Sequence, residues 1–305
     1  MSQIISVIPN VCEGKDQKFI DRLTERLKSI PELVVLDVSM DATRNRTVFA
    51  FTGTKTGIFA GGLVLYEESL KHIDMRKHKG EYPRIGALDV FPFVPLKDVT
   101  IEATVEMSIE FARLVADKFS IPVYLYGESA QLPLRKDVEK IRDVQYEGLE
   151  ERLKDPRWKP DLGPDIFKPD FGATIIGARF PLVSFKMHLS TPDIQIARNI
   201  SNAIQASGGG LRHVAANAGI AYGTQMTQIA VSIYNYQVTP LYKVLEMARM
   251  EAKRYNVGIN EVEMIGLIPE IAFLDSAMYY LSINNFSYER LLEKNIQKHL
   301  HEKLE

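Results

Sequence analysis

A short polar segment between two apolar stretches has the densest group of side chains that could bind an anion or transfer a proton. Residues 74–86 read Asp-Met-Arg-Lys-His-Lys-Gly-Glu-Tyr-Pro-Arg-Ile-Gly, and the basic ones are Arg76, Lys77, Lys79 and Arg84. Guanidinium and ammonium groups bind carboxylates through charge-assisted hydrogen bonds, so this segment could hold an acidic ligand such as a glutamate tail. Runs of charge are more often solvated surface, and on spacing alone that alternative is somewhat favoured.

Two further polar segments are expected at one end of the same sheet. Residues 41–47 separate two adjacent predicted strands, while Asn10 and Glu13 follow the first strand. Asparagine and aspartate are also ordinary turn formers, so a plain turn at residues 41–47 is an equally good interpretation. Cys12 has no second cysteine and no histidine near it in the sequence, which favours a small buried residue over a nucleophile.

A proline-rich connector, about residues 129–171, separates two similar halves of the chain. Its prolines are Pro133, Pro156, Pro160, Pro164 and Pro169. A long segment of this kind is either a linker or a functional loop. Its last part is aromatic, and Phe167 and Phe171 could bracket a flat ring while the prolines stiffen the backbone. We therefore expect a ligand to contact this end of the connector.

Apolar periodicity predicts the same order of elements twice. In the first half, strands are expected at 3–9, 33–38, 47–51, 87–94 and 123–126, and helices at 15–30, 57–72 and 101–119. In the second half, strands are expected at 182–189, 214–221, 228–236 and 261–267, and helices at 192–207 and 240–255. Thr191 is the expected N-cap of the helix that Pro192 begins.

Each half therefore contains a β-α-β-β-α-β unit, which is the ferredoxin-like arrangement. We predict an α+β protein of two duplicated ferredoxin-like subdomains, residues 1–179 (with the connector) and 180–305. Such a unit has helices on one sheet face only, so the halves, or two subunits, are expected to pack over the other faces. A ligand site is then expected at the domain junction. The alternative is that the repeat is a coincidence of the chosen boundaries.

Composition limits the classes of partner. The chain has 305 residues, 46% of them apolar and 25% charged, with a net charge of −2, as in a globular protein. The absence of a cationic bias argues against nucleic acid. There is no apolar run of roughly 18 residues that could span a membrane. The N-terminus lacks a secretory signal, and a single cysteine fits a reducing compartment, so we expect a cytoplasmic protein.

Metal and nucleotide motifs are missing from the sequence. His72 and His78 are six residues apart and do not share a helix face, and no cluster of cysteine and histidine is present. The glycines at 208–210 are not followed by the Gly-Lys-Ser/Thr of a phosphate-binding loop. We therefore expect no metal cofactor.

Several motifs together resemble one known family. They lie at residues 9–14, 45–48, 73–90, 122–128, 160–164, 172–174 and 177–179 and, more thinly, at 238–239, 266–269 and 274–275. Taken together they resemble the formiminotransferase family over nearly the whole chain. The resemblance implies transfer of the formimino group of N-formimino-L-glutamate to N5 of tetrahydrofolate, with release of glutamate, a reaction of histidine degradation and one-carbon metabolism.

The same resemblance implies two ferredoxin-like subdomains, a homodimer and tetrahydrofolate as co-substrate. The folate-binding stretch that it implies is Gly163, Pro164, Asp165, Ile166, Phe167, Lys168, Pro169, Asp170, Phe171 and Gly172. Combined with the polar clusters, it makes the candidate substrate-binding residues Asn10, Asn45, Arg46, Lys79 and Arg84.

One departure from the family concerns the catalytic residue. The family has its catalytic histidine between the counterparts of Glu81 and Pro83, and this chain has Tyr82 there. Histidine titrates near 6.5 and can both take and give a proton at neutral pH. A phenol titrates near 10, so only about one in a thousand is ionised at pH 7. The nearest replacement is His78, followed by Glu81, so the candidate catalytic residues are Tyr82, His78 and Glu81.

Three functions remain open at this point. The first is formimino transfer with a modified acid–base group. The second is another reaction of a reduced folate, for example of 5-formyltetrahydrofolate, for which a weaker base suffices. The third is folate or pterin binding without catalysis, because an intact binding stretch stands beside a missing histidine.

Overall fold

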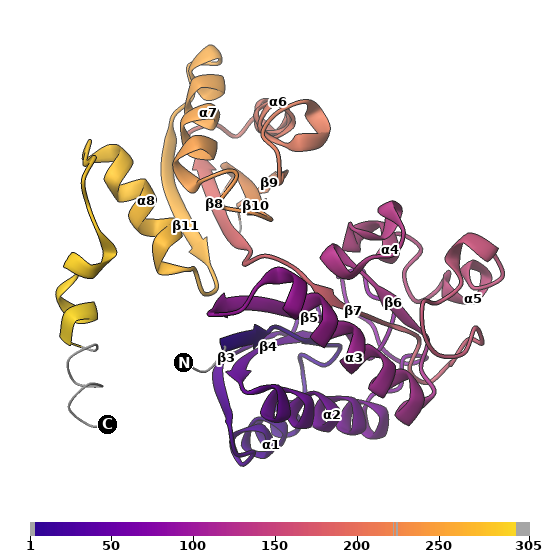
Figure 1. Cartoon of the computed structure of the whole chain (residues 1–305). Helices are drawn as coiled ribbons and strands as arrows, with labels where there is room; N and C mark the ends of the chain where they lie inside the picture. Colours follow the sequence, from indigo (N-terminus) through magenta and orange to yellow (C-terminus); the bar gives the residue numbers. More distant parts are fainter. Residues whose placement is uncertain (1–3, 222, 224, 297–305) are drawn as a thin grey trace. The chain divides into compact units, whose positions relative to one another are not determined.

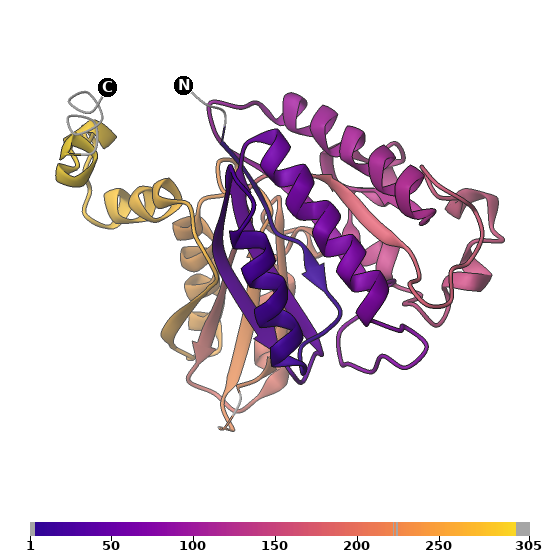
Figure 2. The same ribbon diagram turned by 90° about the horizontal axis from the view of Figure 1, so that it is seen from below.

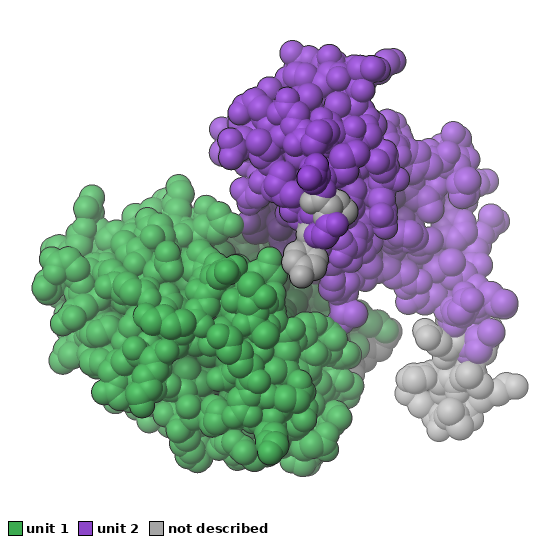
Figure 3. All heavy atoms as spheres, turned by 180° about the vertical axis from the view of Figure 1, so that it is seen from behind, with its two compact units in different colours: residues 1–180 green, residues 181–305 purple. Residues whose placement is uncertain are grey.

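The computed structural model describes residues 4–221, 223 and 225–296, which form two compact units (Figures 1 and 3). The first unit comprises residues 1–180 and the second residues 181–305. The last part of the second predicted subdomain, residues 297–305, lies outside the described residues.

The sheet of the first unit contains seven strands. They are β1 (Ile4–Val7), β2 (Asn10–Val11), β3 (Leu33–Asp41), β4 (Arg46–Gly53), β5 (Leu88–Lys97), β6 (Val123–Leu125) and β7 (Thr174–Ala178). β4 pairs with β3 on one side and with β1 and β2 on the other; β1 and β2 in turn pair with β5, and all these pairs are antiparallel. Parallel pairing extends the sheet from β5 to β7 and from β7 to β6.

Three helices cover one face of this sheet (Figures 1 and 2). They are α1 (Gln17–Lys28), α2 (Lys55–His72) and α3 (Ile101–Phe119). In α1 the buried residues Phe19, Leu23 and Leu27 recur every four positions, which places them on one helix face against the core. Gly62 lets α2 and α3 approach closely, because a Cβ there would lie 2.3 Å from the ring of Phe111.

The connector is folded and covers part of the opposite face. It contains α4 (Val138–Arg142), α5 (Leu149–Arg152) and 3₁₀ turns at Gly127–Ser129, Pro133–Arg135 and Pro156–Trp158. Its buried side chains form a second core with the strands: Ile85, Val90, Tyr124, Tyr126, Ile141, Leu149, Leu153, Ala173 and Ile175. The expectation of a wholly uncovered second face is therefore wrong for β5, β7 and β6.

The second unit is built on an antiparallel sheet with its own core. Its elements are β8 (Val183–Leu189), α6 (Ile194–Ile204), β9 (Val214–Ile220), β10 (Thr227–Ile233), α7 (Leu241–Arg254) and β11 (Ile259–Ile265), followed by α8 (Glu270–Tyr280). The strand order β11-β8-β10-β9 matches the order β5-β1-β4-β3 of the corresponding strands in the first unit. The prediction of a duplicated ferredoxin-like α+β fold is confirmed.

Two local predictions differ from the structure. The N-cap of α6 is Asp193, whose side chain accepts a hydrogen bond from the Gln195 amide at 2.8 Å, whereas Thr191 accepts one from the amide of Asp193. β7 was not predicted.

Among the described residues, no helix is both long and apolar enough to cross a membrane.

Candidate functional site

The basic loop of residues 74–86 and the end of the connector lie against each other. The Met75 amide donates to the Asp170 carbonyl at 2.9 Å, and the Ala173 amide donates to the Ile85 carbonyl at 3.0 Å. Gly172 has φ +85°, and a Cβ there would lie 2.1 Å from the Ile85 carbonyl oxygen. Only glycine therefore suits this contact. The structure thus brings together two segments that the sequence singled out separately.

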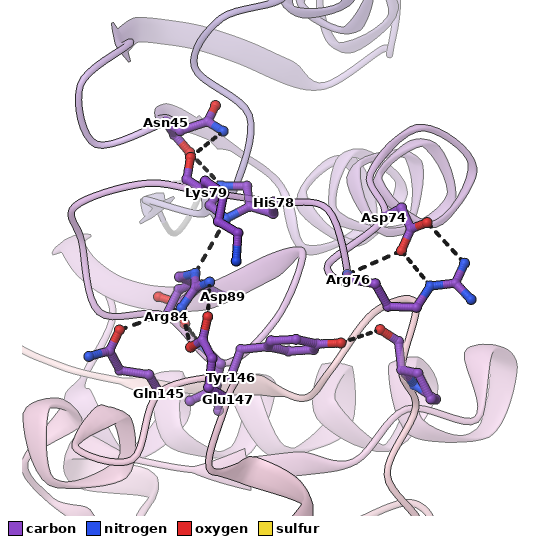
Figure 4. Close-up of polar contacts among 12 residues, drawn as sticks. Asn45, Asp74, Arg76, His78, Lys79, Arg84, Asp89, Gln145, Tyr146 and Glu147 are labelled. Atoms are coloured by element: carbon purple, nitrogen blue, oxygen red, sulfur yellow. Dashed lines mark hydrogen bonds and ion pairs between the residues drawn. The ribbon is translucent and has the colours of Figure 1, made fainter.

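His78 is buried and both of its ring nitrogens are occupied (Figure 4). Its Nε2 lies 3.0 Å from the Asn45 carbonyl oxygen, and its Nδ1 accepts from Nε of Arg84 at 3.3 Å. Burial lowers the pKa of His78, and the neighbouring charge of Arg84 acts in the same direction. A neutral imidazole with both nitrogens engaged is poorly placed to replace a catalytic histidine.

Asn45 links three segments of the site by its side chain. Its Oδ1 accepts from the Gly14 amide at 2.9 Å, and its Nδ2 donates to the Lys79 carbonyl at 2.9 Å. Its backbone has φ +49°, a left-handed conformation that asparagine tolerates better than most residues. The side-chain amide is therefore already used within the protein, so Asn45 positions the loops rather than presenting its amide to a substrate.

Arg84 already holds a carboxylate. Its two terminal nitrogens each donate to Glu147 at 2.7 Å in a bidentate pair, and Arg84 itself is buried (Figure 4). The hydrogen bonds that Arg84 donates to Glu147 raise the pKa of Arg84 and lower the pKa of Glu147. A substrate carboxylate could bind Arg84 only by displacing Glu147.

The other basic side chains of the loop differ in how they are paired. Arg76 donates to Asp74 from Nε at 2.8 Å and from Nη2 at 2.9 Å, and Lys77 lies 3.5 Å from the same carboxylate. Lys79 is exposed and has no ion-pair partner among the described residues. Of the loop's four cations, Lys79 is therefore the one most readily offered to an anionic ligand.

Tyr82 is half-buried, and its ring is contacted by two guanidinium groups. The guanidinium carbon of Arg46 lies 4.0 Å from the centre of the Tyr82 ring, and that of Arg142 lies 5.2 Å from it. Nη1 of Arg142 also donates to the Tyr82 hydroxyl oxygen at 3.1 Å. The candidate catalytic residue is thus held by residues from β4 and from the connector helix α4.

Arg142 is fixed by a buried ion pair with Asp89. The other carboxylate oxygen of Asp89 accepts from the Ile85 amide at 2.9 Å. Burial acts against the charge of Arg142, but Asp89, together with Tyr82 and Tyr126, outweighs it, and the pKa of Arg142 is raised above its ordinary value. Neither group can move without leaving the other buried and unpaired.

Asn10 faces the same side of the sheet as Arg46. It pairs with Val48 on β4, two residues from Arg46, and with Val90 on β5, which belongs to the core under the connector. Side chains two residues apart on a strand share a face, as do directly paired ones. Nδ2 of Asn10 donates to the Ile8 carbonyl at 3.4 Å, while its buried Oδ1 has no partner among the described residues.

The predicted aromatic bracket in the connector is wrong. The ring of Phe171 is fully buried and lies 6.2 Å from that of Tyr66 in the main core, so it has no face free for a ligand. Phe167 packs on Tyr146, with ring centres 5.5 Å apart. Tyr146 in turn donates to the Pro169 carbonyl at 2.6 Å, so these aromatic residues hold the connector in place.

The remaining residues of the connector's end are more open. Ile166 is 70% exposed, and Asp165 pairs with Lys159 at 3.2 Å. The Lys168 carbonyl accepts from the amides of Phe171 and Gly172, which closes a turn. Gly163 has φ +79° and packs on the Ile121 carbonyl. This stretch offers backbone and polar side chains to a ligand more than it offers aromatic faces.

Two other candidates have contrasting surroundings. Glu81 is exposed, and its amide donates to the Thr43 carbonyl at 3.4 Å. Cys12 is buried, and burial raises the pKa of its thiol, which disfavours the reactive thiolate. Within the described residues, no group of three or more histidine, cysteine, aspartate or glutamate side chains could hold a metal ion.

Sequence reasoning missed Asp89, Arg142 and Glu147. Asp89 stands inside an otherwise apolar strand, and a charged residue in such a run is rarely buried without a partner. That signal could have identified it. Arg142 and Glu147 lie among many charged residues of the connector, where no local pattern separates a buried arginine from a solvated one.

Comparison with known proteins assigns the chain to a class of folate-dependent one-carbon transferases. Residues 4–179 match the N-terminal subdomain of the formiminotransferase domain, and residues 187–301 match the formiminotransferase domain. The chain belongs to the formiminotransferase family.

Full-length relatives support this assignment. The chain is 39% identical to the glutamate formimidoyltransferase of Streptococcus pyogenes serotype M1, over 97% of this chain and 99% of the relative. It is also 39% identical to the Thermoplasma acidophilum protein of the same name, over 97% and 98%. It is 37% identical to the formimidoyltransferase-cyclodeaminase of Rattus norvegicus, over 92% of this chain and 53% of the relative.

Proposed function

We propose that this protein transfers the formimino group of N-formimino-L-glutamate to N5 of tetrahydrofolate and releases glutamate. The observation that carries the proposal is the match, over nearly the full length of both chains, to proteins named glutamate formimidoyltransferase. The reaction makes the protein a folate-dependent transferase of one-carbon groups, with tetrahydrofolate as a co-substrate.

Tyr82 is the proposed catalytic residue. It stands at the family's histidine position, its ring is contacted by Arg46 and Arg142, and the residue is only partly buried. His78 is a weaker candidate because its ring is engaged on both sides. Glu81 is accessible, so it stays as the alternative proton carrier.

The proposed ligand contacts divide into direct and indirect ones. Asn10, Arg46 and Lys79 have atoms or charge available on the sheet face and the basic loop, and we assign them to the substrates. Asn45 and Arg84 act indirectly by holding the loop. Residues 163–172 contribute the folate site, chiefly through their backbone.

The larger organisation follows from the same proposal. We propose the two subdomains expected from the sequence, residues 1–179 and 180–305, and the division of the chain into two compact units supports them. We also propose a cytoplasmic homodimer. The family resemblance supports the dimer, and the single cysteine supports the compartment.

Two assays test the function with the full-length protein. The first measures binding of tetrahydrofolate by thermal shift, and the second measures formation of formiminotetrahydrofolate from N-formimino-L-glutamate. Binding with turnover supports the proposal. Binding without turnover favours a non-catalytic folate binder, and turnover of 5-formyltetrahydrofolate alone favours the related folate reaction. Absence of binding to any reduced folate would contradict all three functions.

A further inference from the structure

The hydrogen bond between Arg142 and Tyr82 fixes the direction in which the phenol can donate. A guanidinium has only donors, so at 3.1 Å it must be the Tyr82 oxygen that accepts. The hydroxyl proton of Tyr82 is therefore left for another acceptor. Since Tyr82 is only partly buried, that acceptor can be a ligand.

Negative charge on the Tyr82 oxygen would be compensated in place. Arg46 and Arg142 both lie against the ring, and Asp89 neutralises one of these two charges. Two guanidinium groups and one carboxylate have a formal net charge of +1. A phenolate at Tyr82 would have the opposite charge, −1. Fixed, pre-oriented groups of this kind stabilise charge that develops in a transition state without having to reorganise.

We infer that Tyr82 is the proton carrier of formimino transfer and that Arg142, held by Asp89, is its positioning residue. This inference rests on the proposed function and deepens it. It assigns to a phenol, with a buried arginine–aspartate pair behind it, the role that the family resemblance gives to a histidine.

The proposed step balances without any further reactant. The N5 lone pair of tetrahydrofolate attacks the formimino carbon, and the π electrons of its C=N bond move to that nitrogen. The electron pair on the imino nitrogen then re-forms the C=N bond while the C–N bond to the glutamate nitrogen breaks. The phenol of Tyr82 gives its proton to that leaving nitrogen, and glutamate leaves as the amine. The phenolate then takes the proton that N5 loses. One C–N bond forms, one breaks, and Tyr82 returns to its starting state.

A double-mutant cycle tests the role of Arg142. Tyr82→Phe is expected to lower kcat by roughly 10²–10⁴, the usual value of one acid–base group, and to leave tetrahydrofolate binding unchanged. Arg142→Gln is expected to lower kcat at least about tenfold in the wild-type background and to have little further effect in Tyr82→Phe, because coupled residues are not additive. Equal losses from Arg142→Gln in both backgrounds would overturn the positioning role.

A matched control separates positioning from a general loss of charge. Arg157→Gln removes an exposed arginine of the same connector that is paired with Asp155, and it should retain wild-type kcat. Arg142→Lys keeps the charge while losing the fork geometry, so it should recover part of the activity that Arg142→Gln loses. If the lysine variant is no better than the glutamine variant, Arg142 does not act by its charge.

A second measurement avoids disturbing the buried pair. Replacing Tyr82 by a fluorotyrosine keeps the ring and makes the phenol more acidic. The pH dependence of kcat should then shift to lower pH with increasing acidity of the substituted phenol. A pH profile that does not move would overturn the inference, even if the Arg142 variants failed to fold. Turnover that survives Tyr82→Phe overturns this inference alone, whereas no turnover in the wild type overturns the proposed function.

Discussion

At the scale of single residues, the site is a set of side chains whose polar atoms are mostly used within the protein. His78 donates to Asn45 and accepts from Arg84, a combination that only a neutral imidazole can make. Asn45 and Arg84 are similarly engaged. Tyr82 differs, because its hydroxyl accepts one hydrogen bond and keeps a proton to donate.

The lowered pKa of His78 makes stability depend on pH in a definite direction. The unfolded chain takes up a proton at this histidine near pH 6.5, while the folded chain does so only at lower pH. The unfolded state therefore binds more protons in the window below 6.5, and the free energy of unfolding falls as pH falls there. The contribution of His78 to the slope of the free energy of unfolding against pH cannot exceed about 1.4 kcal/mol per pH unit.

Urea unfolding between pH 5 and 8 checks this expectation. In wild type the free energy of unfolding should fall below pH 6.5, and its advantage over His78→Gln should shrink over the same range. An advantage that is constant with pH, or that grows as pH falls, would show that the histidine is not held neutral.

Asn45 gives a second expectation at this scale. Asn45→Ala loses two side-chain hydrogen bonds worth about 1 kcal/mol each and places alanine at φ +49°, where it costs roughly 1–2 kcal/mol more. A total loss of roughly 3–4 kcal/mol is expected by denaturant unfolding. Asn45→Gly should lose about 1 kcal/mol less stability than Asn45→Ala, because glycine adopts a positive φ without the steric cost of a Cβ. Equal losses would argue against the strained conformation.

At the scale of elements, the connector and the basic loop form one assembly with β5 and β7. The two segments join through the backbone contact of Gly86 with Gly172 and through the hydrogen bonds around it. The connector helix α4 supplies Arg142, and β5 supplies Asp89. The geometry of Tyr82 therefore depends on segments far apart in the sequence.

Gly172→Ala tests this assembly. A Cβ would meet the Ile85 carbonyl at 2.1 Å in addition to the cost of φ +85°, so stability should fall by more than the roughly 1–2 kcal/mol of the backbone term alone. Binding of tetrahydrofolate should weaken with it. The matched control is Gly209→Ala, which has φ +83° but nothing within 4 Å, and which should show the backbone term only. If the two variants lose the same stability, the close contact at Gly172 is not tight.

The regular elements could be predicted from the sequence because their signal is local. The four-residue spacing of Phe19, Leu23 and Leu27 and the alternation along β8 each specify one buried face. The connector could not be predicted in this way. Its helices are four or five residues long, too short for a periodic pattern, and β7 is buried on both faces and shows no alternation.

The candidate site was predicted in part. The basic loop, Tyr82 and the end of the connector were identified, and the structure brings the loop and the connector together. The burial of Phe171 could not be predicted, because an aromatic residue beside prolines fits a ligand wall and a core equally well. The Asp89–Arg142 pair joins residues 53 positions apart, a distance over which one sequence has no pairing signal.

At the scale of the whole molecule, the chain is a duplication in which each unit has its own core. The second unit has a complete four-stranded sheet and a hydrophobic cluster made entirely of its own residues. The first unit likewise buries its helices and its connector against its own strands. Either unit therefore has the material for an independent fold.

Expression of residues 181–305 alone tests that independence. The fragment should show native secondary structure by circular dichroism and a cooperative urea transition, because the described contacts of its core are internal. A fragment without a cooperative transition would mean that the second unit needs the first in order to fold.

The central claim is that Tyr82 carries formimino transfer in this family member. The most direct measurement is the steady-state rate of formiminotetrahydrofolate formation by the full-length wild type, Tyr82→Phe and Tyr280→Phe, the last being an exposed tyrosine of α8 that serves as control. We expect turnover in the wild type and in the Tyr280→Phe control, and a loss of roughly 10²–10⁴ in Tyr82→Phe with tetrahydrofolate binding preserved. A wild type that binds both substrates without turnover, or a Tyr82→Phe protein as fast as wild type, would contradict it.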